Sequence, residues 1–312
     1  MSATSKNPVP PAGGLPAKDG VTAQKAAVSV EFFPPKNEAG AAQMLATAEA
    51  LRGRGIAFAS VTCGAGGAAR EHTLEYSALL QKAGYAVVPH LTCVGYSGEE
   101  LVALADRVLD AGFAGVMALR GDPPKGETCF ATRPDGLAHA SELVELIRER
   151  ERLRGAGRRL RIGVAGYPEK HPESPDEATD LRWLAHKVSR GADLVVTQLF
   201  FDNAVYFRFA ARCAAAGICA PLTPGILPAL SLAQARKFGA FGGAALPSEL
   251  ERRMLACGGD AEAERRVGVA WAHEQVRELL AGGAPGFHLY ILNRAESALE
   301  LFDLLATDDK TV

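Results

Sequence analysis

The 312-residue sequence lacks the features of several protein classes. It has no excess of basic residues, because 34 Lys and Arg stand against 36 Asp and Glu, and the formal net charge is −2. A protein that grips a nucleic-acid backbone would be expected to carry a basic surface. The six cysteines form no CxxC pair and follow no zinc-type spacing. We therefore predict no nucleic-acid partner, no metal, and reduced thiols in a cytoplasmic protein.

The sequence also lacks a signal peptide and an unbroken apolar span. Its first residues, MSATSKNPVPPAGGLPAKDG, are rich in Pro, Gly and polar groups, which predicts a disordered tail over 1–25. Residues 213–235 carry no charge and are numerous enough to cross a bilayer, but Pro221, Pro224 and Pro228 interrupt them. We interpret this stretch as a helix end, a buried strand and a proline-rich turn, and expect no membrane association.

What the sequence does contain is an alternation of short apolar runs with longer amphipathic segments. Eight strand-then-helix units follow one another, with predicted strands at 28–33, 58–63, 86–93, 115–120, 161–167, 193–200, 222–227 and 287–292. The runs are nearly continuous in apolarity, as expected of parallel strands buried on both faces. A doubly wound open sheet shows the same alternation, but it would be expected to open with G-x-G-x-x-G where this chain has EFFPPKNEAG. The count of eight favours an α/β fold that is a single (β/α)8 TIM barrel over 26–308.

Polar residues interrupt the apolar runs where the predicted strands end. They include Glu31, Thr62, His90, Thr92, Arg120, Gly121, Asp122, Tyr167, Gln198, Tyr290, Asn293 and Arg294. A single polar residue of this kind is usually a satisfied structural group. In a barrel, however, the carboxyl ends of all strands share one face, and that face carries the chemistry. The recurrence of polar residues at strand ends therefore predicts one active site there.

These same segments resemble a known family. VEFFPPK, SVTCGAGG, PHLTC, ALRGDPP, YPEKHPE, TQLFFD, PGILP and LNRAE are similar, in order, to the signatures of methylenetetrahydrofolate reductases, and they cover about residues 28–306. The resemblance implies a barrel that holds FAD at its strand carboxyl ends. It also implies that Glu31 is the general acid, kept neutral by apolar surroundings such as Val30, Phe32 and Phe33. Asp122 would lie beside the flavin ring and influence its charge.

The resemblance assigns further residues to two ligands. The predicted FAD-binding residues are Thr62, Cys63, Ala65, His90, Arg120, Gly121, Asp122, Ala140, Tyr167, His171, Asp180 and Lys187. The predicted substrate-binding residues are Gln198, Gln234, Phe238, Tyr290 and Arg294. Without the family, Asp180 and Lys187 would be read as a solvated helix face. For Phe238, a core role stays open as an alternative. Cys63, Trp183 and an enlarged loop over 123–137 depart from the family pattern and concern the adenosine end of FAD.

The implied reaction is a ping-pong reduction of methylenetetrahydrofolate to methyltetrahydrofolate. NADH or NADPH would reduce the flavin and leave, and the folate would then take its place. The methyltetrahydrofolate formed would supply methyl groups for methionine synthesis. Two alternatives stay open: the same enzyme run as a methyltetrahydrofolate oxidase, and a non-catalytic flavin- or folate-binding subunit. We also expect a homo-oligomer.

Overall fold

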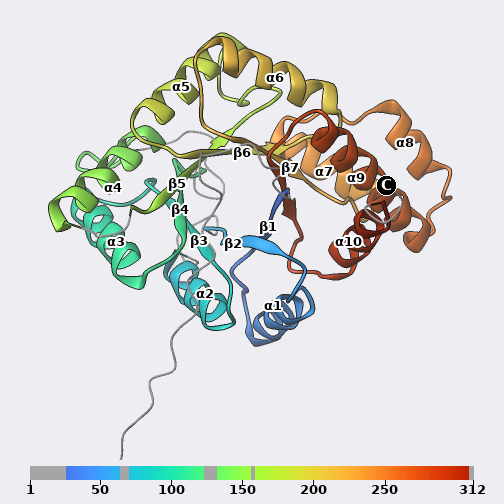
Figure 1. Cartoon of the computed structure of the whole chain (residues 1–312), viewed down its shortest axis with the longest axis horizontal. Helices are drawn as coiled ribbons and strands as arrows, with labels where there is room; N and C mark the ends of the chain where they lie inside the picture. The colour runs from blue at the N-terminus through green and yellow to red at the C-terminus, as the bar shows by residue number, and fades with distance from the viewer. Residues whose placement is uncertain (1–25, 64–69, 123–131, 156–158, 309–312) are drawn as a thin grey trace, which may run out of the picture.

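The strands of the computed structural model close into one barrel. The structure describes residues 26–63, 70–122, 132–155 and 159–308, so the predicted tail and Ala65 lie outside it. Each strand pairs in parallel with the next, and β8 pairs with β1 (Figure 1). The strands are β1 (Ala27–Phe32), β2 (Ile56–Val61), β3 (Val87–Thr92), β4 (Gly115–Leu119), β5 (Arg161–Gly166), β6 (Leu194–Leu199), β7 (Leu222–Ile226) and β8 (Gly286–Tyr290). The predicted fold class is confirmed.

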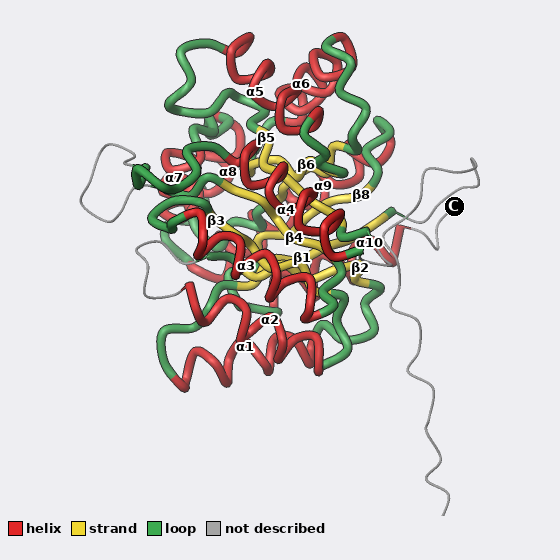
Figure 2. The backbone as a smooth tube through the Cα atoms, turned by 90° about the vertical axis from the view of Figure 1, so that its left-hand side faces the viewer, coloured by secondary structure: helices red, strands yellow, loops and turns green. Residues whose placement is uncertain are grey.

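Helices surround this barrel on all sides (Figures 1 and 2). They are α1 (Glu38–Ala50), α2 (Arg70–Lys82), α3 (Gly98–Ala111), α4 (Ala140–Arg154), α5 (Glu177–Ser189), α6 (Asn203–Ala215), α7 (Leu232–Gly242), α8 (Ser248–Leu255), α9 (Ala261–Ala281) and α10 (Glu296–Asp308). One helix follows each strand except β7, which is followed by α7, α8 and α9. α8 and α9 are therefore additional to the one helix expected in each strand-then-helix unit.

Local sequence signals account for helix ends. At α3, the Ser97 side chain accepts a hydrogen bond from the Glu100 backbone N–H, and the Glu100 carboxylate accepts one from the Ser97 N–H. This reciprocal pair satisfies two of the N–H groups that a helix start leaves without intrahelical partners. Gly112 then ends α3 in the left-handed conformation that glycine adopts without a steric penalty. The loop that leads from the carboxyl end of β3, at the barrel mouth, is thus fixed where it enters α3.

Strand alternation separates two apolar layers. Val30 and Phe32 are fully buried in the large core between strands and helices. Ser29 and Glu31, on the opposite face of β1, point into the barrel, where Phe58, Met117 and Val196 belong to a smaller inner cluster. The barrel is therefore filled at its centre, and polar groups are placed toward its carboxyl end.

The uncharged segment 213–235 folds as predicted. It contains the end of α6, then β7, then the turn before α7. Among the described helices, none is both long and apolar enough to cross a membrane.

Candidate active site

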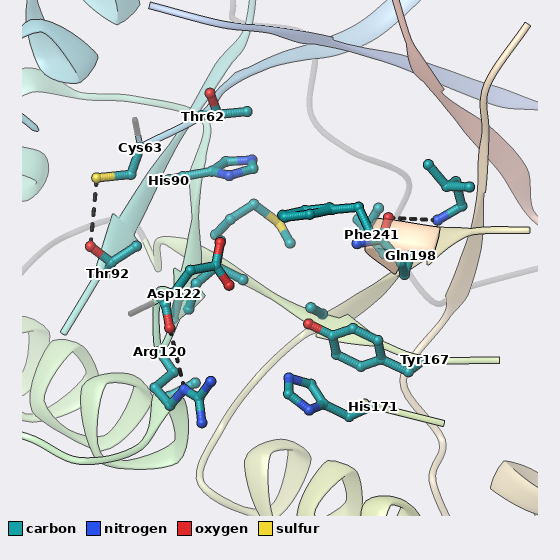
Figure 3. Close-up of a pocket in the computed structure, with 18 of the residues that line it drawn as sticks. Thr62, Cys63, His90, Thr92, Arg120, Asp122, Tyr167, His171, Gln198 and Phe241 are labelled. Atoms are coloured by element: carbon teal, nitrogen blue, oxygen red, sulfur yellow. Dashed lines mark hydrogen bonds between the residues drawn. The ribbon is translucent and has the colours of Figure 1, made fainter. Parts of the chain in front are cut away.

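A cavity of about 730 Å³ opens at the carboxyl ends of the strands (Figure 3). Its size is within the range of small-molecule sites. All eight strands, or the residues directly after them, contribute to its wall. The predicted residues that line it are Glu31, Thr62, Cys63, His90, Arg120, Gly121, Asp122, Ala140, Tyr167, His171, Asp180, Lys187, Gln198, Phe238 and Tyr290. The fold thus brings most of the predicted site together.

Glu31 lies at the inner end of this cavity between two histidines. Its Oε2 is 3.5 Å from His90 Nε2 and 3.6 Å from His288 Nε2, and its side chain is 9% exposed. His288 Nδ1 is in turn 2.7 Å from Ser29 Oγ. Burial lowers the pKa of His90 to about 4; the Glu31 carboxyl opposes this effect, and His288 adds to it. His90 is therefore neutral at pH 7, and the row Ser29–His288–Glu31–His90 is a buried polar cluster inside the barrel.

The surroundings of Glu31 differ from those expected from its sequence neighbours. We expected Val30, Phe32 and Phe33 to provide an apolar setting, but Val30 and Phe32 face the helices on the other side of the strand. Successive side chains of a strand point to opposite faces. Phe33 does line the cavity with Glu31, and the residues beside the carboxyl are the two histidines, brought from β3 and β8.

The end of β4 supplies a charged group to the rim. Arg120 donates two hydrogen bonds to the Glu173 carboxylate, at 2.6 and 2.7 Å, and its Nε donates to the Gly121 carbonyl. This pairing raises the pKa of Arg120. The Asp122 carboxylate lies near Arg120 and on the same side of the cavity as His90 (Figure 3). Gly121 has a φ of +93°, and an added Cβ would lie 2.4 Å from Val94 Cγ1, so only glycine fits there.

The loop after β5 and helix α5 form another wall. The Tyr167 and His171 rings meet edge to face at 4.5 Å. Burial raises the pKa of Tyr167 to about 12, to which the Asp122 and Asp180 carboxylates add. Asp180 Oδ2 accepts a hydrogen bond from the His171 backbone N–H. Lys187 Nζ donates to the Ala165 carbonyl at 2.5 Å. The face of α5 that carries Asp180 and Lys187, seven residues apart, therefore lines the cavity.

Lys187 is a cation in a confined position. Burial lowers the pKa of its ammonium to about 8, while the Asp180 carboxylate acts in the opposite direction. A burial penalty of this kind is relieved when an anion approaches. Lys187 is thus suited to a negatively charged group on a ligand.

Gln198 and Tyr290 form the wall opposite the β4 rim. Gln198 Oε1 accepts a hydrogen bond from the Leu199 backbone N–H at 2.8 Å, and Gly242 packs against the Gln198 side chain. The Tyr290 hydroxyl donates to the Thr197 carbonyl at 2.7 Å, and burial raises the pKa of Tyr290 well above its ordinary value. Tyr290 is therefore a neutral, fixed phenol at this end of the cavity.

Two predicted substrate residues lie outside the cavity lining. Gln234 uses its Oε1 to accept a hydrogen bond from the Leu230 backbone N–H, which fixes the turn before α7. Arg294 is exposed and borders a small recess next to Tyr290 and Leu230. Their roles stay predictions.

Further residues that the sequence did not predict as site residues also line the cavity, among them His288, Phe241, His139 and Trp183. His288 is 2% exposed inside the barrel, while Phe241 is 70% exposed and enters the cavity from the Gln198 side (Figure 3). His139 and Trp183 line the α4–α5 side. A polar residue in the middle of the apolar run FHLYIL was a signal for His288. No local pattern marked Phe241 or His139.

One polar atom of the wall is unsatisfied. Thr62 Oγ1 is buried and has no hydrogen-bond partner among the described residues. Buried hydroxyls normally have a partner, so this atom is suited to a polar ligand. Within the described ranges, no group of three or more His, Cys, Asp or Glu residues is arranged to hold a metal ion.

The fold has the architecture of a barrel enzyme. Its mouth holds a cavity with a carboxyl, that of Glu31, at the inner end and charged groups at the rim. The family model described as methylenetetrahydrofolate reductase matches residues 17–306. The chain belongs to the methylenetetrahydrofolate reductase family.

Two relatives show how the match extends over the chain. The chain is 36% identical over 270 residues to 5,10-methylenetetrahydrofolate reductase of Escherichia coli, covering 86% of this chain and 87% of that protein. It is 34% identical over 295 residues to methylenetetrahydrofolate reductase (NADH) 1 of Arabidopsis thaliana, covering 91% of this chain and 49% of the plant protein. The chain therefore spans about half the length of the plant relative.

One solved structure supports the fold. An uncharacterized protein from Clostridium thermocellum, described as binding two copies of 5-methyl-5,6,7,8-tetrahydrofolic acid, superimposes with a TM-score of 0.60. It is 14% identical and covers 92% of this chain and 96% of its own. At that identity the likeness concerns the fold alone.

Proposed function

We propose that this protein is an FAD-dependent reductase that converts methylenetetrahydrofolate to methyltetrahydrofolate with NADH or NADPH, in a ping-pong cycle that supplies methyl groups for methionine synthesis. One observation carries the proposal. In a chain of this family, Glu31, Asp122 and Gln198, from three separate strand ends, line the same cavity. A proton donor, an anionic group and an amide for a heterocycle are the groups that this reaction requires.

The cavity fits a dinucleotide flavin. Gly121 permits close approach of the backbone, the unsatisfied Thr62 hydroxyl offers a hydrogen bond, and Lys187 offers a cation for a pyrophosphate. We infer that Thr62, Gly121 and Lys187, together with the other predicted residues of the lining, hold FAD. Bound there, FAD would supply the hydride transfer between the nicotinamide and the one-carbon unit.

The residues of the chain handle the proton. Opening the methylene bridge of the folate requires a proton on the amine nitrogen that leaves, and Glu31 is the buried carboxyl in the cavity. The low pKa of His90 keeps that ring neutral, so His90 places no positive charge next to Glu31. Asp122, at the rim that follows β4, can stabilise the cationic folate species through its negative charge. Gln198 can bind the pterin ring with its amide.

The proposal is tested with an absorbance spectrum and an anaerobic titration. Purified protein should show flavin absorbance, lose it on addition of NADH or NADPH, and recover it when methylenetetrahydrofolate is added. Protein without bound flavin that also fails to take up added FAD would refute the proposal. Bleaching without recovery would refute the folate half of it. An isolated chain that bleaches with NADH also excludes a non-catalytic subunit that depends on a partner for electrons.

A further inference from the structure

A tight turn follows β8 at the edge of the cavity. The Arg294 backbone N–H donates a hydrogen bond to the Ile291 carbonyl at 2.9 Å, which closes the turn. The two central residues, Leu292 and Asn293, have positive φ values of +52° and +56°. Residues other than glycine rarely adopt this left-handed conformation, and asparagine tolerates it better than leucine does. The turn therefore carries backbone strain, of the kind that is concentrated at functional sites.

The Asn293 side chain reaches from this turn to the end of β1. Its Oδ1 accepts a hydrogen bond from the Phe33 backbone N–H at 2.9 Å, and its Nδ2 donates one to the Phe33 carbonyl at 2.8 Å. The Asn293 carbonyl also accepts a hydrogen bond from Thr47 Oγ1 at 2.9 Å, and Thr47 is buried on α1. One residue therefore joins the turn after β8 to β1 and to the helix that follows β1.

Phe33 relies on this side chain because the sheet stops before it. The β1–β8 ladder ends at the pair Glu31–Tyr290, and β1 itself ends at Phe32. The two residues after Phe33 are prolines, which have no backbone N–H to donate. The Asn293 amide pairs with both the N–H and the carbonyl of Phe33, which a further residue of strand would otherwise do. It therefore extends the support of β1 beyond the last ladder pair.

The residues that this anchor holds belong to the cavity. Phe33 and Leu292 line it, and so does Glu31, two residues before Phe33. Asn293 does not line the cavity, so it acts on a ligand only through these neighbours. Glu31 thus lies between the last ladder pair and the Phe33 anchor. A displacement of about 1 Å at a reacting group can slow a reaction by about 10²-fold, so an anchor at this place matters for catalysis.

We propose that Asn293 is a positioning residue of the active site, which holds the end of β1 so that the Glu31 carboxyl meets the folate. The inference rests on the proposed function, because it assigns Asn293 to the half-reaction in which Glu31 donates a proton. The strained turn places Leu292 in the cavity wall and directs the Asn293 amide toward Phe33. Without this amide, the backbone of Phe33 loses both of its partners, and the Glu31 carboxyl loses its fixed position.

The test measures both flavin half-reactions of the holoenzyme by stopped flow in the wild type, Asn293→Gly, Glu31→Gln and the double variant. Glycine removes the side chain but accepts a positive φ, so Asn293→Gly keeps the turn without the anchor. Reoxidation by saturating methylenetetrahydrofolate should slow roughly 10- to 100-fold in this variant, while bleaching by NADH stays within about twofold. In the Glu31→Gln background, the same change should slow reoxidation by less than about twofold, because the group that Asn293 positions is already absent.

Asn203→Ala is the matched control. Asn203 is a buried asparagine whose Nδ2 donates to the Gln275 carbonyl at 3.1 Å, and it does not line the cavity. Its loss should lower the midpoint of urea unfolding and leave both half-reactions within about twofold of wild type.

Three results would refute the positioning role while the proposed function stands. They are reoxidation of Asn293→Gly at the wild-type rate, equal slowing of its two half-reactions, and equal slowing of reoxidation with Glu or Gln at position 31. A wild type that fails to bleach with NADH, or to recover with methylenetetrahydrofolate, would refute the proposed function and this inference with it.

Discussion

Replacing Glu31 with Gln isolates the proton that the proposed reaction requires. Gln has nearly the shape of Glu, so it can occupy a site where the side chain is 9% exposed and keep a polar contact with His90 and His288. Both histidines contact Oε2, so we expect Oε1 to face the ligand. The substitution then removes a proton donor with little change in packing.

The size of the effect follows from this role. General acid catalysis contributes about 10²- to 10⁴-fold, which corresponds to about 3–5 kcal/mol of the activation barrier. The nicotinamide half-reaction uses no proton from Glu31. Stopped-flow measurement of flavin bleaching by NADH should therefore give a rate within about twofold of wild type. Reoxidation by methylenetetrahydrofolate should slow by about 10²-fold or more.

A suitable control is Glu169→Gln. Glu169 is a half-buried carboxyl outside the cavity that accepts a hydrogen bond from the Ala245 backbone N–H. It should affect neither half-reaction. Reoxidation of Glu31→Gln at the wild-type rate would show that another group delivers the proton, and equal slowing of both half-reactions would point to a disturbed cavity.

Three further predictions concern the cavity wall and the fold. Gly121→Ala should destabilise the protein by about 3 kcal/mol in urea unfolding, because it combines a positive φ with a 2.4 Å approach of the new Cβ to Val94. The control Gly53→Ala, at a φ of +79° with no atom within 4 Å of the new Cβ, should lower the free energy of unfolding by only about 1–2 kcal/mol. Equal losses in the two variants would contradict the steric argument. The FAD dissociation constant should begin to rise near pH 8, because Lys187, whose pKa is lowered to about 8, loses its positive charge above that pH and no longer attracts phosphate. Lys187→Met should bind FAD more weakly at pH 7 and show no rise near pH 8. A parallel rise in this variant would show that another group causes the pH dependence. Arg148→Ala should lower the free energy of unfolding in urea by about 3–5 kcal/mol, because Arg148 pairs with Glu151 and Asp193 while its side chain is only 16% exposed. The control Arg252→Ala removes a side chain that is 69% exposed and should change the free energy of unfolding by less than about 0.5 kcal/mol. Similar losses in the two variants would contradict the burial argument.

The sequence by itself determined the elements and their order. Strand and helix periodicities and the count of eight units are local properties, so they predicted the barrel without knowledge of any long-range contact. The polar residues at strand ends indicated the cavity because parallel strands in a barrel all end at one face. The resemblance to the family, whose motifs occur in the same order along this sequence, assigned roles to these positions.

Only the tertiary structure decided which side chains meet. Glu31 contacts His288 because closure of the barrel pairs β1 with β8, and no local pattern encodes a register between strands more than 250 residues apart. The same holds for the stacked rings of Trp183, on α5, and His139, the residue before α4. Gln234 and Arg294 are absent from the lining: the Gln234 side chain accepts a hydrogen bond in the turn before α7, and Arg294 is exposed. Periodicity sets the face on which a residue lies, whereas packing between distant elements decides what that face touches.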